Sequence, residues 1–400
     1  MPILELAVPP GATKSYRHML EAGRRLVRLI LVSFPEDPEA LAAAARLHDL
    51  AHDTERELAC WRLCLELDPT YLPAHLRLSV LALQAGRYDE VIALTNDALR
   101  YHPRSPECQT MLAEALMNLA RLSEAEQVLR QHLELYPQSI PGRFLLGNLL
   151  VRQKRFEEAI PQLEQVVRLA PNHASALHNL ATACARLGRA KEAEEFRRQL
   201  ARLKQAEQAA QKAGLQQFVD ENLAPSVVAQ IANAGGRLFL RAGNSGMAEA
   251  LFRHAAALDP RNIQCRVFLS NLLHQRGEWR EALRIVVELR ALEPFELSHH
   301  RNAGLLYSKL GRFDLAEAAF RDMWMLAPNS AMGPAAIAEV YLLAGKDLTE
   351  ARRLTEKAVA LEPSPAHYKL LAEVCRRLGD GPAAAWAVEK SQRAQSGAAP

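Results

Sequence analysis

The chain has 400 residues, of which 49% are hydrophobic and 24% are charged, a composition typical of a folded, soluble protein. Lys and Arg number 49 against 46 Asp and Glu, which leaves a formal charge of +3. This near balance argues against nucleic acid as a partner, because a nucleic-acid-binding surface needs a strong basic field.

The first residues predict neither a targeting segment nor a membrane span. Met1 to Pro10 is apolar but has no basic start, no long hydrophobic stretch and no small-residue cleavage site. The apolar stretch from Leu26 to Phe34 is too short to cross a bilayer and contains Arg28. We therefore expect a cytoplasmic protein without a membrane partner.

Prolines recur along the chain at a fixed interval of 34 residues, in two series. The first series is Pro35, Pro69, Pro103, Pro137 and Pro171, and the second is Pro260, Pro294 and Pro328, followed by Pro363 after one extra residue. A fixed period in this range predicts a stacked array of helical repeats, in which each unit packs only on its neighbours.

The stretch that ends at Pro328 shows what one repeat contains. Gly311 separates two helical runs and supplies the permissive backbone that a tight turn needs. Ala316 is small enough for the two helices to approach closely, and Phe313 and Phe320 fill the space between them. Pro328 ends the second run, because proline has no backbone N–H to donate. We expect each repeat to be a pair of antiparallel helices.

The same residue types recur at the same offsets in other stretches. Four further copies are Gly86, Tyr88, Ala98 and Pro103; Gly147, Phe156, Ala159 and Pro171; Gly243, Ala248, Phe252 and Pro260; and Gly277, Trp279, Ala282 and Pro294. This pattern resembles the tetratricopeptide repeat, although Glu57 replaces the small residue of the first hairpin and Lys154 replaces the turn glycine of the fourth. The resemblance implies an all-α fold, a right-handed α-solenoid of about ten helix-turn-helix hairpins in two blocks.

The spacing of the prolines also divides the chain. Pro171 and Pro260 lie 89 residues apart, which is 21 more than two repeats require. We place this insertion before a helix restart near Pro225. The expected organisation is an N-terminal tail and capping helix at 1–35, a first repeat block at 36–205, a helical linker at 206–226, a second repeat block at 227–395 and a disordered tail at 396–400.

Four asparagines are candidates for binding a partner. Asn148 and Asn179 lie 31 residues apart on consecutive first helices, and Asn271 and Asn302 repeat this spacing. In the family that the chain resembles, first helices line a concave groove that holds extended peptides. An amide side chain suits this role because it both donates to and accepts from a peptide backbone. The alternative is that these asparagines bond to neighbouring helices or to water.

The pattern departs from that of family members that clamp a C-terminal carboxylate. Phe144 and Val267 stand where the clamp has a lysine four residues before the first asparagine. Met332 and Ala336 stand where the following basic pair would lie in the second block. The sequence therefore favours recognition of a peptide backbone over capture of a free carboxylate.

A series of basic residues near the ends of first helices is a second candidate for the groove. If this repeat position faces the groove, its cations form an electropositive strip suited to acidic segments. The alternative, which we favour, is that they complement the helix dipole, each worth about 0.3–1 kcal/mol. The series is Arg152, Arg186, Arg241, Lys309 and Arg377.

One group of residues has some of the features of a zinc site. His48 and His52 lie four apart on one helix, and Cys60 and Cys64 lie four apart on its partner helix. However, His48 and Cys64 fall at core positions of the repeat, and a C-x3-C spacing is not typical of zinc knuckles. We expect no metal site.

Enzymatic signatures are missing from the sequence: we find no P-loop, no dinucleotide glycine fingerprint, no H-E-x-x-H and no G-x-S-x-G. We expect no catalytic activity and no cofactor. The predicted function is that of a non-catalytic scaffold or adaptor, which binds extended peptide segments of partner proteins in its concave grooves. The alternative is a regulatory or substrate-recruiting subunit of a separate enzyme, in glycosyl transfer or in a secretion or assembly system. A homo-oligomeric structural element is a third interpretation.

Overall fold

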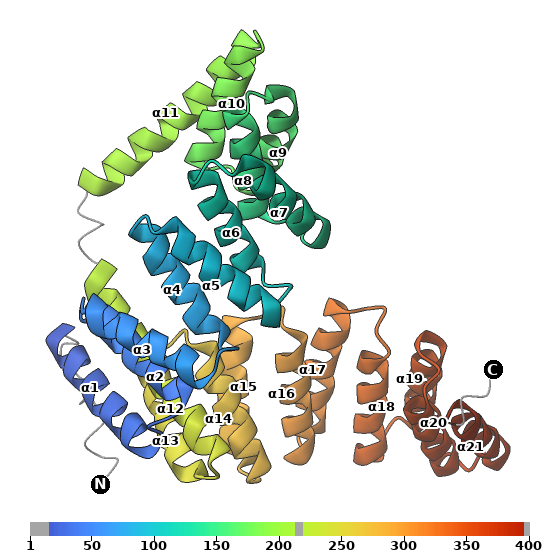
Figure 1. The fold of residues 1–400 in the computed structure, drawn as a ribbon. Coiled ribbons are helices and arrows are strands. Elements are labelled where there is room, and N and C mark those ends of the chain that lie inside the picture. Colours follow the sequence, from blue (N-terminus) through green and yellow to red (C-terminus); the bar gives the residue numbers. More distant parts are fainter. Residues whose placement is uncertain (1–15, 213–218, 396–400) are drawn as a thin grey trace. The chain divides into compact units, whose positions relative to one another are not determined.

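The structure is a computed structural model that describes residues 16–212 and 219–395. These ranges contain 21 α-helices and no strand, which confirms the all-α prediction (Figure 1). A single helix, α1 (Tyr16–Ser33), precedes ten helical hairpins. None of the described helices is long and apolar enough to cross a membrane.

Each hairpin consists of a first helix, here called the A helix, and a second, the B helix. The A helices are α2 (Pro38–Leu50), α4 (Leu72–Gln84), α6 (Pro106–Asn118), α8 (Ile140–Arg152), α10 (Ala174–Arg186), α12 (Val219–Arg241), α14 (Ile263–Gln275), α16 (Leu297–Lys309), α18 (Met332–Ala344) and α20 (Pro365–Arg377). The B helices are α3 (Thr54–Leu67), α5 (Tyr88–Tyr101), α7 (Leu122–Leu135), α9 (Phe156–Leu169), α11 (Ala190–Lys212), α13 (Ser245–Leu258), α15 (Trp279–Leu292), α17 (Phe313–Leu326), α19 (Leu348–Leu361) and α21 (Gly381–Gln395).

The chain divides into two compact units, Met1–Leu238 and Phe239–Pro400, and the division falls within α12. We call them unit 1 and unit 2. Within each unit, helices that follow one another along the chain pack side by side. The helix α12 begins at Val219, upstream of Pro225, so the helix restart lies earlier than that proline indicates. The block limits derived from the proline spacing stay predictions.

A residue with left-handed backbone lies in the turn of every hairpin. Seven of these turn residues are glycines, as the repeat predicts, and the other three are His52, Ala120 and Lys154, while the turn after α18 has Asp347 as a second left-handed residue besides its glycine. The φ angles of the seven glycines and these other three residues lie between 56° and 79°, and within each block they follow one another at intervals of 34 residues. A left-handed residue after a helix lets the chain reverse direction while the last helical carbonyls stay hydrogen-bonded. Lys154 therefore keeps the turn conformation even though it replaces the glycine.

Small residues allow the two helices of a hairpin to pack closely. A Cβ atom on Gly304 of α16 would lie 2.5 Å from Phe320 of α17, and one on Gly147 of α8 would lie 2.6 Å from Leu163 of α9. Both distances are well below van der Waals contact, so only glycine fits at these positions. Ala316 and Phe320 are buried in the hairpin core, as the sequence pattern predicts.

Successive hairpins are also joined by a recurring polar contact. A side chain in the first turns of an A helix contacts the carbonyl oxygen of the proline six residues earlier, where the preceding B helix has ended. Because proline carbonyls next to helix ends lack a helical partner, this contact satisfies an acceptor at the four junctions where it occurs. The four pairs are His75 Nε2 and Pro69 O (2.9 Å), Gln109 Nε2 and Pro103 O (3.1 Å), Arg143 Nε and Pro137 O (2.9 Å), and His300 Nε2 and Pro294 O (2.8 Å).

The structure explains why Glu57 can replace the small residue of the first hairpin. Its carboxylate is buried, and its Oε1 accepts hydrogen bonds from Arg77 Nε at 2.6 Å and from Trp61 Nε1 at 3.3 Å. Arg77 also donates to Asp49 at 2.6 Å. A buried carboxylate is tolerated only when it is paired in this way.

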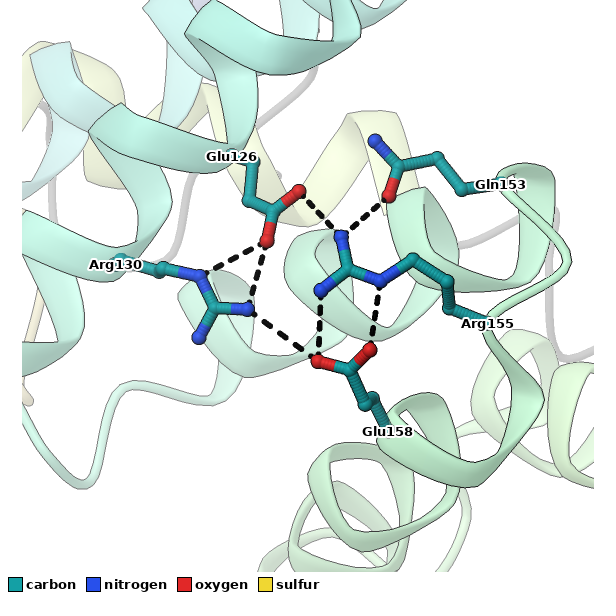
Figure 2. A network of polar contacts seen from close by, with 5 residues as sticks. All are labelled: Glu126, Arg130, Gln153, Arg155 and Glu158. Atoms are coloured by element: carbon teal, nitrogen blue, oxygen red, sulfur yellow. Dashed lines mark hydrogen bonds and ion pairs between the residues drawn. The ribbon is translucent and has the colours of Figure 1, made fainter.

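Exposed ion pairs connect neighbouring B helices in unit 1. Arg155 at the start of α9 donates to Glu126 of α7 and to Glu158 of its own helix, both at 2.7 Å (Figure 2). Arg130 donates to Glu126 at 2.7 Å and lies 3.6 Å from Glu158, which closes a four-residue network. Partial burial opposes ionisation of Glu126, but the hydrogen bonds from Arg130 and Arg155 outweigh it and lower the pKa of this carboxyl.

The N-terminal helices of unit 1 pack against the first part of α12. Arg237 of α12 forms an ion pair with Glu39 of α2 at 2.7 Å. A Cβ atom on Gly23 of α1 would lie 2.7 Å from Leu47 and 3.5 Å from Val228, so α1 approaches both α2 and α12 closely. The alanine run at 42–45 of α2 is buried throughout. The predicted capping helix is thus covered on one side by a segment far away in the sequence.

A fully buried histidine links three segments of unit 1. His132 Nδ1 lies 2.9 Å from Gln109 Oε1, and His132 Nε2 lies 2.8 Å from Ser139 Oγ. In the neutral ring, Nδ1–H donates to the Gln109 amide oxygen and the Ser139 hydroxyl donates to Nε2. Protonation would reverse the second bond, so that Nε2–H donates to the Ser139 hydroxyl, but burial disfavours the added charge and lowers the pKa of His132 below its ordinary value of 6.5.

We expect the turn residues to respond in opposite ways to matched substitutions. Ala120→Gly should raise the free energy of unfolding by about 0.5–1 kcal/mol, because glycine removes the strain of a left-handed alanine. Gly311→Ala should lower it by about 1 kcal/mol, and purely through the backbone, since no atom lies within 4 Å of the added Cβ. Urea unfolding followed by circular dichroism measures both. Equal effects of the two substitutions on the free energy of unfolding would contradict the left-handed backbone at these turn positions.

The stability of unit 1 should fall as the pH decreases below about 6.5. The pKa of His132 is depressed in the folded state, so the unfolded chain takes up the proton first, and stability that is complete above 6.5 is lost on acidification. His132→Leu should show a smaller difference in urea midpoint between about pH 7.5 and about pH 5.5 than the wild type does. His178→Leu, which changes an exposed histidine, should behave as the wild type. An unchanged difference in His132→Leu would rule out this residue as the origin.

Candidate functional site

The four predicted asparagines all lie on A helices, at two repeat positions. Asn148 of α8 and Asn271 of α14 each lie six residues before the left-handed turn residue of their hairpin. Asn179 of α10 and Asn302 of α16 each lie nine residues before it. The two units therefore present the same pair of positions on two consecutive A helices.

In unit 2 the structure brings the two asparagines together at one hollow. Asn271 and Asn302 both line a cavity of about 200 Å³ between α14 and α16. Val286, Leu305 and Leu306 give it an apolar lining, and Val286 and Leu306 are almost fully buried. A concave apolar surface with a few polar groups at its edge is typical of binding sites.

The amides of these asparagines are not used by the fold. Asn148, Asn179 and Asn302 are half-buried and Asn271 is exposed. Within the described ranges none of the four makes a hydrogen bond, whereas asparagines with structural roles do. Asn244 and Asn262, for example, accept hydrogen bonds from Met247 N at 3.0 Å and Cys265 N at 3.2 Å and cap α13 and α14. The contact with neighbouring helices, given above as the alternative, is therefore not seen for the four candidates.

The position that a carboxylate clamp would fill with lysine is occupied differently in unit 1. The ring of Phe144 packs against the ring of His173, with centroids 4.6 Å apart and planes inclined by 41°. His173 is the residue before α10, and its ring accepts a hydrogen bond from Ala176 N. Phe144 thus contributes to the packing of consecutive A helices and offers no charge to a ligand.

The basic series does not act as one group. Arg152 donates to the carbonyl oxygen of Met117 at 3.3 Å, at the C-terminal end of α6, as the helix-dipole interpretation predicts. Arg377 lies 3.5 Å from Glu373 of its own helix. Arg186, Arg241 and Lys309 are exposed. A continuous electropositive strip stays a prediction.

The residues of the zinc alternative serve other purposes in the structure. His52 is the left-handed turn residue of the first hairpin, and His48 lies 3.9 Å from Asp53. The Cys64 thiol donates to the Pro38 carbonyl at 3.3 Å, and burial raises its pKa to about 12. The thiol is thus used as a hydrogen-bond donor between the two helices of the first hairpin. In the described part of the chain, no group of three or more His, Cys, Asp or Glu residues could hold a metal ion. Cys60 therefore belongs to no such group.

Two histidines that stand out in the sequence are structural. His299 and His300 are buried in the first turn of α16. His299 Nε2 lies 2.9 Å from Glu293 Oε2, and His300 contacts the Pro294 carbonyl in the recurring contact described above. Neither side chain lines the hollow between α14 and α16.

Two cationic residues of the hollow were not predicted from the sequence. Arg301 and His274 line it together with Asn271 and Asn302. Arg301 directly precedes Asn302, and His274 lies three residues after Asn271, so each is a helical neighbour of a predicted residue. Helical periodicity around the asparagines could have indicated them, and so could the comparison of equivalent repeat positions, because Lys369 and Arg376 occupy the same two positions in the last hairpin.

Comparison with known families supports the repeat assignment. Models of the tetratricopeptide repeat match residues 82–146, 144–213 and 269–330. Residues 41 to the end of MamA from Desulfovibrio magneticus RS-1 are 18% identical, with a TM-score of 0.39, over 42% of this chain and 96% of that chain. Yeast Tom70 is 14% identical, with a TM-score of 0.34, over 89% of this chain and 92% of that chain. A search of curated proteins finds no match.

The family models match in both units, and the segments that they match consist of the hairpins described above. The 34-residue interval of the turn residues agrees with the length of the repeat. The chain is a tetratricopeptide repeat protein.

Proposed function

We propose that the protein is an interaction scaffold that binds an extended segment of a partner protein between α14 and α16. The observation that carries the proposal is the pair of unbonded amides, Asn271 and Asn302, at the edge of an apolar hollow. An extended peptide has backbone N–H and C=O groups without internal partners, and an asparagine amide satisfies one of each. The hollow below the amides has room for an apolar side chain of the segment.

The corresponding pair in unit 1, Asn148 and Asn179, supports a second binding position of the same kind. The helices α8 and α10 that carry it contact each other directly. A partner with two suitable segments would gain avidity from binding at both positions, because the second contact forms within the complex. A scaffold that recruits substrates to a separate enzyme would use the same two positions.

The proposal predicts that Asn271→Ala combined with Asn302→Ala weakens binding at least about tenfold, since two amides that each make hydrogen bonds to a backbone are lost. The probe is the nine-residue peptide that a display library enriches most strongly on the full chain, measured by fluorescence anisotropy. Asn172→Ala with Asn329→Ala, two exposed loop asparagines, is the matched control. An unchanged Kd in the first double variant, with unchanged helicity, would remove this site from the proposal.

Unit 1 is tested separately with Asn148→Ala and Asn179→Ala. If both units bind, the wild-type chain should take up two equivalents of a peptide that fits both asparagine pairs, and this double variant should take up one, measured by isothermal titration calorimetry. Two equivalents in the variant would show that Asn148 and Asn179 do not form the second binding position.

A further inference from the structure

The hollow between α14 and α16 contains a guanidinium and an imidazole that have no use within the fold. Arg301 and His274 line it, and both side chains are exposed. Neither makes a hydrogen bond or an ion pair with any residue of the described ranges. No carboxylate is among the residues that line the hollow, so its positive charge is not compensated locally.

Several other arginines of the same two hairpins are engaged, whereas Arg280, Arg284 and Arg312 make no ion pair with the described residues but do not line the hollow. Arg266 pairs with Glu288 at 3.0 Å, and Arg290 pairs with Asp322 at 2.7 Å. Arg276 forms an ion pair with Glu249. Arg301 thus differs from its neighbours, because it faces a concave surface without a partner. An unpaired guanidinium beside free amides and an apolar lining is complementary to a ligand that carries a carboxylate.

We propose that this hollow selects partner segments in which an Asp or Glu side chain and a large apolar side chain lie two residues apart. The inference rests on the proposed function and adds the chemistry of the segment. The apolar side chain occupies the hollow against Leu305 and Leu306, the carboxylate accepts from Arg301 and from His274, and the amides of Asn271 and Asn302 hold the backbone.

The spacing of two follows from geometry. Side chains i and i+2 of an extended segment point to the same side, about 6.5–7 Å apart. Arg301 and Leu305 lie four residues apart on α16, so their Cβ atoms lie about 5–6 Å apart on one helix face. A carboxylate and an apolar group that reach these two side chains must therefore come from the same side of the segment.

A side-chain carboxylate is the source that the site favours over a free C-terminus. The lysine position of the carboxylate clamp is Val267 here, and the following basic pair is replaced by Met332 and Ala336. An extended chain that continues in both directions can contact both amides, since these lie on different helices.

In the experiment, binding peptides are selected from a nine-residue library. Each peptide is joined to its carrier at both ends, so that no free carboxyl terminus is present. The full chain is compared with Arg301→Gln, Arg301→Glu and Arg280→Glu. The last variant places the same charge reversal on an exposed residue of α15 that does not line the hollow. Circular dichroism checks that all four proteins are folded.

We expect the wild type and Arg280→Glu to enrich an acidic residue two positions from a large apolar one. Arg301→Gln should bind the selected peptide at least about tenfold more weakly, and Arg301→Glu should enrich Lys or Arg at the acidic position. Enrichment without an acidic position, or an acidic preference that survives in Arg301→Glu, would overturn the inference and leave the proposed function standing. No enrichment in any arm would overturn the proposed function itself.

Discussion

The left-handed residue in each hairpin turn determines the register of the whole array. It fixes how many residues separate the end of an A helix from the start of its B helix, and it does so at the same interval in each block. Because the turn is constant, equivalent positions of successive A helices face the same way. The pairs Asn148 and Asn179, and Asn271 and Asn302, occupy equivalent places in the two units for this reason. A hairpin cannot bury its apolar face alone, so it must also pack on the neighbouring hairpins.

Much of the fold could be predicted from the sequence, because the repeat expresses the same physical requirements many times. Turn glycines, small residues at helix contacts and prolines after B helices each have a local cause. Lys154 and Glu57 are different. The backbone of Lys154 keeps the left-handed conformation although nothing in its side chain requires it, and Glu57 is buried because Arg77, 20 residues later, pairs with it. A contact between two hairpins cannot be predicted from the sequence of one.

Part of the candidate site could also be predicted from the sequence, and part of it could not. The asparagine pair of unit 2 could be predicted, since its spacing repeats and the structure brings both amides to one hollow. Arg301 and His274 are less evident, because only the last hairpin, with Lys369 and Arg376, has Lys or Arg at the same two positions. The packing of α12 on α1 and α2 was also beyond the sequence pattern, as it joins segments about 200 residues apart through single contacts such as Arg237 with Glu39.

The two faces of the hairpins differ in the kind of interaction that they use. On the B helices of unit 1, the network of Arg130, Arg155, Glu126 and Glu158 is exposed, and dissolved ions screen such pairs (Figure 2). The proline carbonyl contacts and the apolar cores between A helices respond much less to ions. In a stacked array a small rotation per hairpin accumulates along the chain. Dissolved ions therefore weaken the contacts between neighbouring B helices of unit 1 more than those of the A helices, which carry Asn148 and Asn179.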